Sequence, residues 1–441
     1  MAWQPLNRRI LRLALPTILM NISVPLLGAV DTAVVGHLEE LHFLGAVSVG
    51  TLMFTILYWG FGFFRMSTVG LTAQAWGRRD TGEAINILGR AVLLGVAVGL
   101  AIILLRGPIV RLGLHLIDAT PQVEFYAERY FRIRVLAAPA AFLSFVFVGW
   151  FYGMNNVAYP VALTVAVNVL NVGLNFWFVL GLGMSSDGVA WATVAAQYAG
   201  LLTTGGLFWW RYRDLLGGLV PREVLRWSRL QAMFLLNGNI LVRTLSLLFA
   251  HAFFMAQSAA LGELILAVNT ILLQFRHIAA YAMDGFATAA EVLVGAAVGR
   301  GDREGLLRAI RLSQRWGMLI GVAISAVYLL GSPWLPGVFT TNEQVLALAG
   351  VYIWWVVLDP LVSNIPFILD GVYIGATGTR TMRNTMIFSV FGVFLPLFFV
   401  LQWAFGNHGM WAATVLLYVV RGATLHWPVM RLQRDPGYSL R

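Results

Sequence analysis

The chain alternates between long apolar runs and short polar connections along its whole length. A membrane-spanning helix needs roughly 20 predominantly apolar residues, and these runs reach that length without the residue-by-residue alternation of barrel strands. The pattern therefore predicts an all-α integral membrane protein. The twelve predicted spans are 10–35, 43–73, 86–106, 126–152, 160–182, 188–210, 231–257, 264–297, 307–330, 345–374, 384–405 and 409–430.

Arginines gather in every second connection, whereas the other connections carry acids such as Glu39, Glu40 and Glu263. Arg106 and Arg111 are the exception, because they lie at the outer end of the third span, where the other connections carry acids. Since basic residues favour the cytoplasmic side of a membrane, the pattern predicts an inner-membrane protein with both termini in the cytoplasm.

The second half of the sequence resembles the first. Gly77 and Asp80 recur as Gly299 and Asp302, a shift of 222 positions. Further matches at a shift of 221 or 222 are Pro139 with Pro360, Gly149 with Gly371, and Gly153 with Gly375. Each half holds six predicted spans, so we expect two parallel six-helix repeats around a central cleft, which is typical of an alternating-access carrier. The predicted parts are an N-lobe (1–210), a cytoplasmic linker (211–230) and a C-lobe (231–441).

Composition narrows the class further. Of the 441 residues 59% are hydrophobic and 11% charged, against about 25% charged in soluble domains. There is no cysteine, so disulfides, thiol catalysis and thiolate metal sites are excluded. All 30 basic residues are arginine, so a nucleotide-binding loop ending in GK[ST] is absent and an ion gradient is the expected energy source. The net charge of +10 lies in the connections and reflects membrane topology, not nucleic-acid binding.

The loops at Asp80 and Asp302 have a structural interpretation. Both aspartates precede predicted helices, and the DTGE sequence at 80–83 matches a capping box. A gating role for these loops is the alternative.

Polar residues inside the predicted spans are the candidate functional residues. Asp31 interrupts the first apolar run close to its outer end, and a carboxyl group there could take a proton from outside and release it inside. A static, hydrogen-bonded aspartate is the alternative. Asn168, Asn171 and Asn175 follow helical spacing on the fifth span, so they line either a polar site or a helix–helix contact.

The second half carries its own buried acids. Asp284 and Glu291 lie seven residues apart on the eighth span, and Asp359 and Asp370 lie on the tenth. The possible partners are Arg243, His251, Arg276 and His277. Such a network could bind cations or be a neutralised structural cluster. The histidines are too scattered to indicate a metal site.

Three segments, 62–77, 284–302 and 370–384, resemble the DinF branch of the multidrug and toxic compound extrusion (MATE) family, and the similarity covers nearly the whole chain. The resemblance implies a secondary antiporter, not an enzyme, that exports organic, often cationic or amphipathic compounds against an inward flow of H⁺ or Na⁺. It implies no cofactor, and we expect a monomer surrounded by membrane lipids.

The resemblance also implies roles for individual residues. Asp31 resembles the coupling carboxylate of the first helix, and Pro16 the proline at which that helix bends. Asn171 and Asn175 resemble the fifth-helix positions beside the carboxylate, although some relatives carry Asp where this chain has Asn175. The implied first-lobe binding set is Asn168, Asn171, Asn175, Tyr130 and Thr193. Asp370, with Asp284 and Glu291, is the candidate C-lobe cation site, and the seventh-helix acid of the sodium-coupled branch has no clear match here.

These observations predict an H⁺-coupled multidrug antiporter in which protonation of Asp31 releases the drug outward. A Na⁺-coupled antiporter that uses Asp370 is the first alternative. A flippase for lipid-linked precursors is the second, although Arg65, Arg243 and Arg276 are few for binding a pyrophosphate. A membrane enzyme is the third, but the sequence has no metal cluster and no nucleophile–base pair to support it.

Overall fold

The apolar runs form the long helices that their length predicts. The computed structural model describes the chain except residues 1–2, 37–39, 118, 436, 438 and 441, and it describes only the backbone at 3–5, 24–36 and 41. In that described part the regular structure is entirely helical. Nine helical segments there are long and apolar enough to cross a membrane. The other three predicted spans lie on α1 (Trp3–Gly36), α9 (Ser186–Tyr212) and α17 (Asn407–Arg434), so the all-α membrane fold is confirmed.

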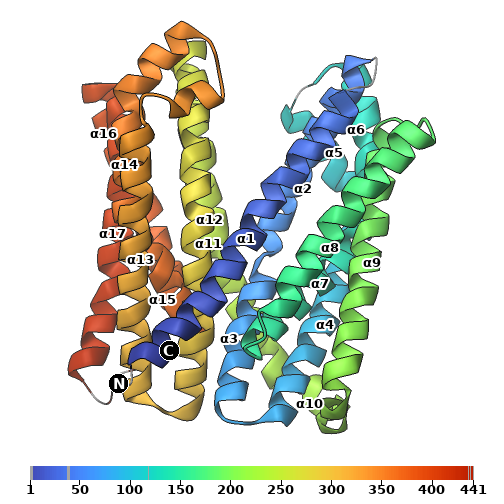
Figure 1. Ribbon diagram of the computed structural model, residues 1–441, viewed down its shortest axis with the longest axis vertical. Coiled ribbons are helices and arrows are strands. Elements are labelled where there is room, and N and C mark those ends of the chain that lie inside the picture. The colour runs from blue at the N-terminus through green and yellow to red at the C-terminus, as the bar shows by residue number, and fades with distance from the viewer. Residues whose placement is uncertain (1–2, 37–39, 118, 436, 438, 441) are drawn as a thin grey trace. The chain divides into compact units, whose positions relative to one another are not determined.

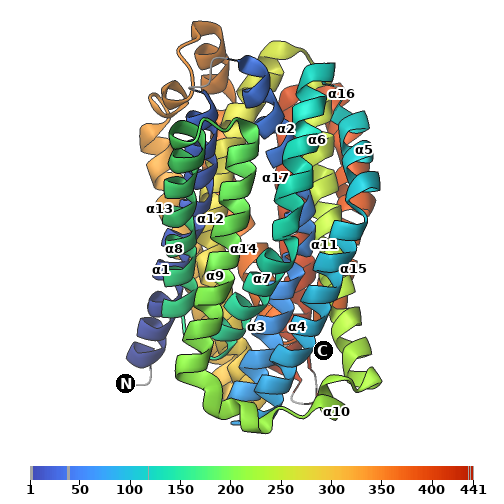
Figure 2. The same ribbon diagram turned by 90° about the vertical axis from the view of Figure 1, so that its right-hand side faces the viewer.

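The chain divides into two compact units, and the helices of each lie side by side (Figures 1 and 2). Unit 1 consists of Met1–Ile18 and Phe234–Arg441, and unit 2 of Leu19–Met233. Helix α1 therefore belongs to both units, and the chain passes from one to the other after Ile18. The predicted linker, 211–230, falls within unit 2.

Unit 2 refines several predicted boundaries. The predicted span 43–73 is two helices that meet at Gly62, and α5, which is 12 residues long, carries the exceptional Arg106 and Arg111 between spans. The elements of unit 2 after α1 are α2 (Leu41–Phe61), α3 (Phe63–Gly77), α4 (Thr81–Leu104), α5 (Arg106–Ile117), α6 (Pro121–Arg134), η1 (Val135–Ala137), α7 (Ala138–Gly153), α8 (Ala158–Asn175), the π-helical η2 (Phe176–Gly181), α9, η3 (Arg213–Gly218) and α10 (Pro221–Val224).

Unit 1 holds the longest helices. Its core is built from buried apolar side chains such as Phe254 and Trp411, whose rings pack edge to face at 5.1 Å. The elements of unit 1 after α1 are α11 (Trp227–Ala260), α12 (Glu263–Arg300), α13 (Arg303–Gly331), η4 (Leu335–Val338), α14 (Glu343–Gly375), α15 (Thr379–Ile387), the π-helical η5 (Phe388–Phe394), α16 (Leu395–Phe405) and α17.

Large apolar side chains also lie on the outside of both units. Trp403 is 90% exposed and Leu202 is 77% exposed. Hydrocarbon, unlike water, solvates such side chains without cost, so this surface is the one expected of helices in lipid.

The repeat in the sequence is a repeat of helix contacts. A Cβ atom on Gly149 of α7 would meet the carbonyl oxygen of Arg65 on α3 at 2.5 Å. At the equivalent position, a Cβ atom on Gly371 of α14 would meet the carbonyl oxygen of Ala287 on α12 at 2.2 Å. The paired glycines therefore mark the same close backbone approach in each half.

Candidate functional site

The first predicted site residue lies on α1. The structure places Asp31 in this helix, but its side chain lies outside the described residues, so its role stays a prediction. Pro16 lies in the same helix, three positions before the chain passes into unit 2 at Leu19. The helix continues through Pro16, and the Thr17 hydroxyl beside it donates a hydrogen bond to the carbonyl of Leu13 at 2.8 Å.

A buried amide cluster joins α8 to α9 in unit 2. Asn175 Nδ2 donates to Asn171 Oδ1 at 3.0 Å, and Asn171 Nδ2 donates to Thr193 Oγ1 at 3.2 Å. Thr193 in turn donates to the carbonyl of Val189 at 3.0 Å. Asn171 is 2% exposed and Asn175 is fully buried. The structure thus brings together three of the five implied first-lobe residues, and the π-helical turn η2 begins directly after Asn175.

The other two implied residues belong to different polar groups. Asn168 Nδ2 donates to Ser23 Oγ on α1 at 3.0 Å. Tyr130 on α6 accepts a hydrogen bond from Arg134 Nη1 at 2.5 Å, and Arg134 also donates to Thr51 at 3.2 Å. Helical spacing alone could not separate these groups, because it orders residues along one helix and does not identify the helix opposite.

Unit 1 buries ion pairs where the sequence suggested a cation site. Asp370 on α14 accepts hydrogen bonds from two guanidinium groups through one oxygen, Oδ2; the donors are Arg243 on α11 and Arg421 on α17. All three residues are at most 8% exposed. We define these three residues as the arginine–aspartate cluster, and its formal charge is +1 because arginine stays protonated.

This arrangement disfavours the predicted cation site in the conformation observed. Two guanidinium groups already occupy Asp370, and they repel a further cation. In the described part of the chain, no group of three or more His, Asp or Glu side chains could hold a metal ion, so Asp370, Asp284 and Glu291 do not form such a group. The cation site stays a prediction that this geometry does not favour.

A second buried pair lies on the same helix, α14. Asp359 Oδ1 lies 3.2 Å from Arg276 Nε on α12, and Asp359 Oδ2 also accepts a hydrogen bond from Ser363 at 3.1 Å. The guanidinium of Arg276 lies 4.7 Å from the ring centroid of Tyr418 on α17. Two of the four possible partners named from the sequence, Arg243 and Arg276, thus pair with acids of the tenth span.

Sequence reasoning missed Arg421. The residue lies inside the twelfth predicted span, where an arginine is costly unless it is paired or used. That rule alone could have identified it as a candidate, but its partner lies 51 residues away and only the folded helices bring the two together.

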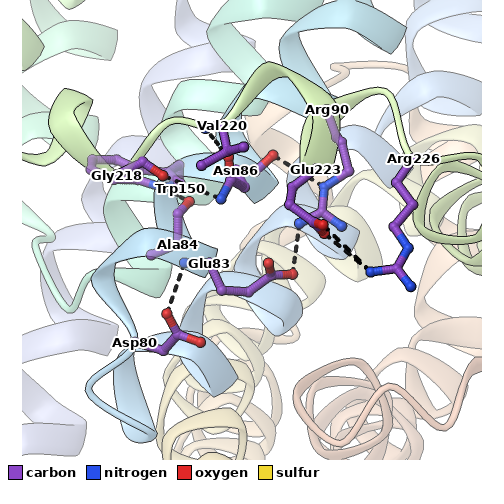
Figure 3. Close-up of polar contacts among 10 residues, drawn as sticks. All are labelled: Asp80, Glu83, Ala84, Asn86, Arg90, Trp150, Gly218, Val220, Glu223 and Arg226. Atoms are coloured by element: carbon purple, nitrogen blue, oxygen red, sulfur yellow. Dashed lines mark hydrogen bonds and ion pairs between the residues drawn. The ribbon is translucent and has the colours of Figure 1, made fainter.

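The loop after α3 and the linker of unit 2 form an ordered polar region (Figure 3). Asp80 Oδ1 accepts from the backbone N–H of Glu83 at 2.9 Å, and Asp302 caps α13 in the same way, so both predicted caps are confirmed. The capping box is incomplete, because the Glu83 side chain binds Arg90 at 2.6 Å instead of the Asp80 backbone.

Asn86 ties the linker to α4. Its Nδ2 donates to the carbonyl of Gly218, and its Oδ1 accepts from the N–H of Val220 at 2.9 Å (Figure 3). These two bonds hold the linker at Gly218 and Val220 against α4.

Comparison with known proteins identifies the family. Residues 16–200 and 240–400 match the MatE family. The chain belongs to the MatE family. It is 39% identical to DNA damage-inducible protein F of Escherichia coli (strain K12) over 96% of this chain and 93% of that protein. It is 25% identical to a probable multidrug resistance protein NorM of Rhizobium meliloti over 98% of this chain and 95% of that protein.

Solved structures share the fold of this MatE protein. One is described as an outward-facing conformation of a multidrug resistance MATE family transporter of the MOP superfamily. It superposes with a TM-score of 0.88 at 20% sequence identity and covers 97% of this chain and 96% of that one. The resemblance inferred from the motifs is confirmed, and this chain is a multi-pass membrane transporter, not an enzyme.

Proposed function

We propose that this MatE transporter exports organic compounds, often cationic or amphipathic, in exchange for protons that move inward through Asp31. A relative that aligns along nearly the whole chain is named as a probable multidrug resistance protein, which supports the substrate class. The proposal places the chain in the cell inner membrane as a monomer with both termini in the cytoplasm, and it requires no cofactor.

The observation that carries the choice of ion is the state of the buried acids in unit 1. Asp370 and Asp359 are both paired with arginine. Each carboxylate is already held by at least one guanidinium, whose positive charge repels a sodium ion, so neither acid is suited to bind a cation. We therefore assign the coupling role to Asp31 rather than to these two acids, since Asp31 belongs to unit 2 together with the amide cluster of Asn171, Asn175 and Thr193.

In the proposed cycle, deprotonated Asp31 and the amides favour a bound cation or polar compound. Uptake of an external proton removes the negative charge and changes the hydrogen bonds that the carboxyl group can make. The compound then leaves outward, α1 rearranges near Pro16, and the proton is released to the cytoplasm. A binding site with few fixed polar contacts suits loose specificity.

Reconstituted vesicles test this proposal when pH and sodium gradients are imposed independently. We expect efflux of a fluorescent organic cation to follow the pH gradient, and Asp31→Asn to reduce it to the level of protein-free vesicles. The matched control is Asp214→Asn, which removes an exposed linker carboxylate and should leave efflux unchanged.

Three outcomes would refute the proton mechanism. Proton-driven efflux that persists in Asp31→Asn would show that Asp31 is not the coupling residue. Efflux that follows sodium at fixed pH and is lost in Asp370→Asn would support the sodium alternative. Transbilayer movement of a lipid-linked pyrophosphate without drug efflux would support the flippase.

A further inference from the structure

The arginine–aspartate cluster of unit 1 has an unbalanced charge. Arg243, Asp370 and Arg421 come from three different helices, α11, α14 and α17, and two positive groups meet one negative group there. The Arg276–Asp359 pair, whose aspartate also lies on α14, is itself neutral and adds no net negative charge. An excess charge buried among apolar helices is costly unless a counter-charge accompanies it.

Hydrogen bonding in the cluster is also incomplete. In the described part of the chain, Arg243 Nε and Arg421 Nε are buried donors that have no hydrogen-bond partner. Both arginines share the same acceptor, Asp370 Oδ2, so neither forms the two-point contact that a guanidinium makes with a whole carboxylate. Asp370 Oδ1 also has no hydrogen-bond partner, and its negative charge repels an anion. The two positive guanidinium charges exceed the single negative charge of the carboxylate, so the net interaction with an anion is attractive.

We propose that the arginine–aspartate cluster is a binding site for one monovalent anion, either chloride or the carboxylate of a transported compound. The anion neutralises the excess charge and accepts hydrogen bonds from the unpartnered guanidinium nitrogens. Access is on the side of Arg243 and Asp370, whose side chains are 10% and 8% exposed, whereas Arg421 at 1% forms the base of the site. This site lies in unit 1 and does not depend on proton coupling through Asp31.

The low polarity of the surroundings increases the effect of the cluster's excess positive charge. Attraction between opposite charges strengthens as the local dielectric constant falls, so a single excess charge attracts an anion more strongly here than at a hydrated surface, and this attraction opposes the loss of the anion's hydration. Guanidinium groups suit halide and carboxylate acceptors because their N–H donors lie in one plane and their charge is permanent.

Binding of radiolabelled chloride to the purified full-length protein in detergent tests the proposal. We expect saturable binding of chloride. Acetate should displace the bound chloride if the site also accepts carboxylates, and should leave the binding unchanged if the site accepts only chloride. Arg243→Gln neutralises the cluster and should weaken binding roughly tenfold or more, because a charge-assisted contact is lost. Asp370→Asn raises the formal charge to +2 and should tighten binding by a similar factor.

The control is Arg90→Gln in unit 2, which also removes a buried arginine that is paired with an acid. Chloride binding should be the same in this variant as in the unmodified protein. If Arg243→Gln does not fold, the opposite effect expected of Asp370→Asn still decides the question.

Three results would overturn the proposal. The first is chloride binding that does not saturate. The second is an equal loss of binding in Arg243→Gln and Arg90→Gln. The third is weaker binding in Asp370→Asn, which would show that the carboxylate attracts the ligand. Proton-driven export is measured separately, so it can fail while chloride binding persists, and the reverse also holds.

Discussion

Both units bury uncharged contacts between helices, such as Asn269 with Asn407 in unit 1, but in the part of the chain that the structure describes the buried ion pairs between helices lie in unit 1. Unit 2 joins α8 to α9 through the uncharged side chains of Asn171, Asn175 and Thr193, whereas unit 1 joins its helices through charged pairs centred on Asp370 and Asp359.

Equivalent positions show how the two halves diverged. The position 222 residues before Asp370 is Val148, and the position 221 residues before Arg421 is Gly200. By contrast, Gly149 and Gly371 are both retained where helices touch. Close backbone contact therefore constrained both copies, while the polar side chains were free to differ, because they can change without moving the helices.

The charged interior of unit 1 should be the more fragile. Asp370→Leu leaves two buried guanidinium groups without their carboxylate, and we expect it to lower the free energy of unfolding by about 3–5 kcal/mol. The measurement is the thermal unfolding midpoint of the purified protein in detergent. Asp214→Leu, on a carboxylate that is 95% exposed, is the matched control and should leave the midpoint unchanged. Equal midpoints for the two variants would show that the cluster contributes nothing to stability.

A side chain added at the close helix contacts that both units share should destabilise the two units equally. Gly371→Ala and Gly149→Ala each place a Cβ atom within 2.5 Å of a backbone oxygen, and each should cost about 2 kcal/mol. Gly173→Ala on α8 is the control, because no atom lies within 4 Å of its new Cβ and alanine favours the helix. Parallel measurements of unfolding would contradict the repeat interpretation if only one of the two variants were destabilised.

The uncharged cluster of unit 2 should tolerate loss better than the charged one. Thr193→Val removes the hydroxyl that accepts from Asn171, at a cost of about 1 kcal/mol, since hydrogen bonds between helices in membranes are worth roughly that much. Thr203→Val on the same helix also loses a bond to a carbonyl four residues earlier, but it removes no contact between helices. Identical unfolding midpoints for the two variants would argue against the α8–α9 bond as a stabilising contact.

The smallest expected change in stability comes from exchanging residues in the loops after α3 and α12. Arg79 has φ 59° where the second half has Gly301 with φ 67°. Arg79→Gly relieves the strain of the left-handed backbone conformation but increases the conformational entropy of the unfolded chain. We therefore expect the free energy of unfolding to rise by about 0.5 kcal/mol. Gly301→Arg should cost a similar amount. Unfolding curves that move in the same direction for both exchanges would show that backbone conformation does not control these loops.

Local patterns were enough to predict much of this molecule. The length of the apolar runs located the helices, because hydrocarbon requires backbone hydrogen bonds to be made within each helix. The 222-residue shift identified the duplication, and Asp80 and Asp302 identified two helix starts, because a cap acts within a single turn. Local signals were weaker where a helix is interrupted, as at Gly62.

Only the tertiary structure determined which polar side chains meet. Arg243 and Asp370 are 127 residues apart, and nothing in the spacing of either helix indicates the other. The same holds for the separation of Tyr130 and Asn168 from the amide cluster. Periodicity specifies which face of a helix is polar, but the partner of that face is set by how whole helices pack, and packing depends on contacts spread along their full length.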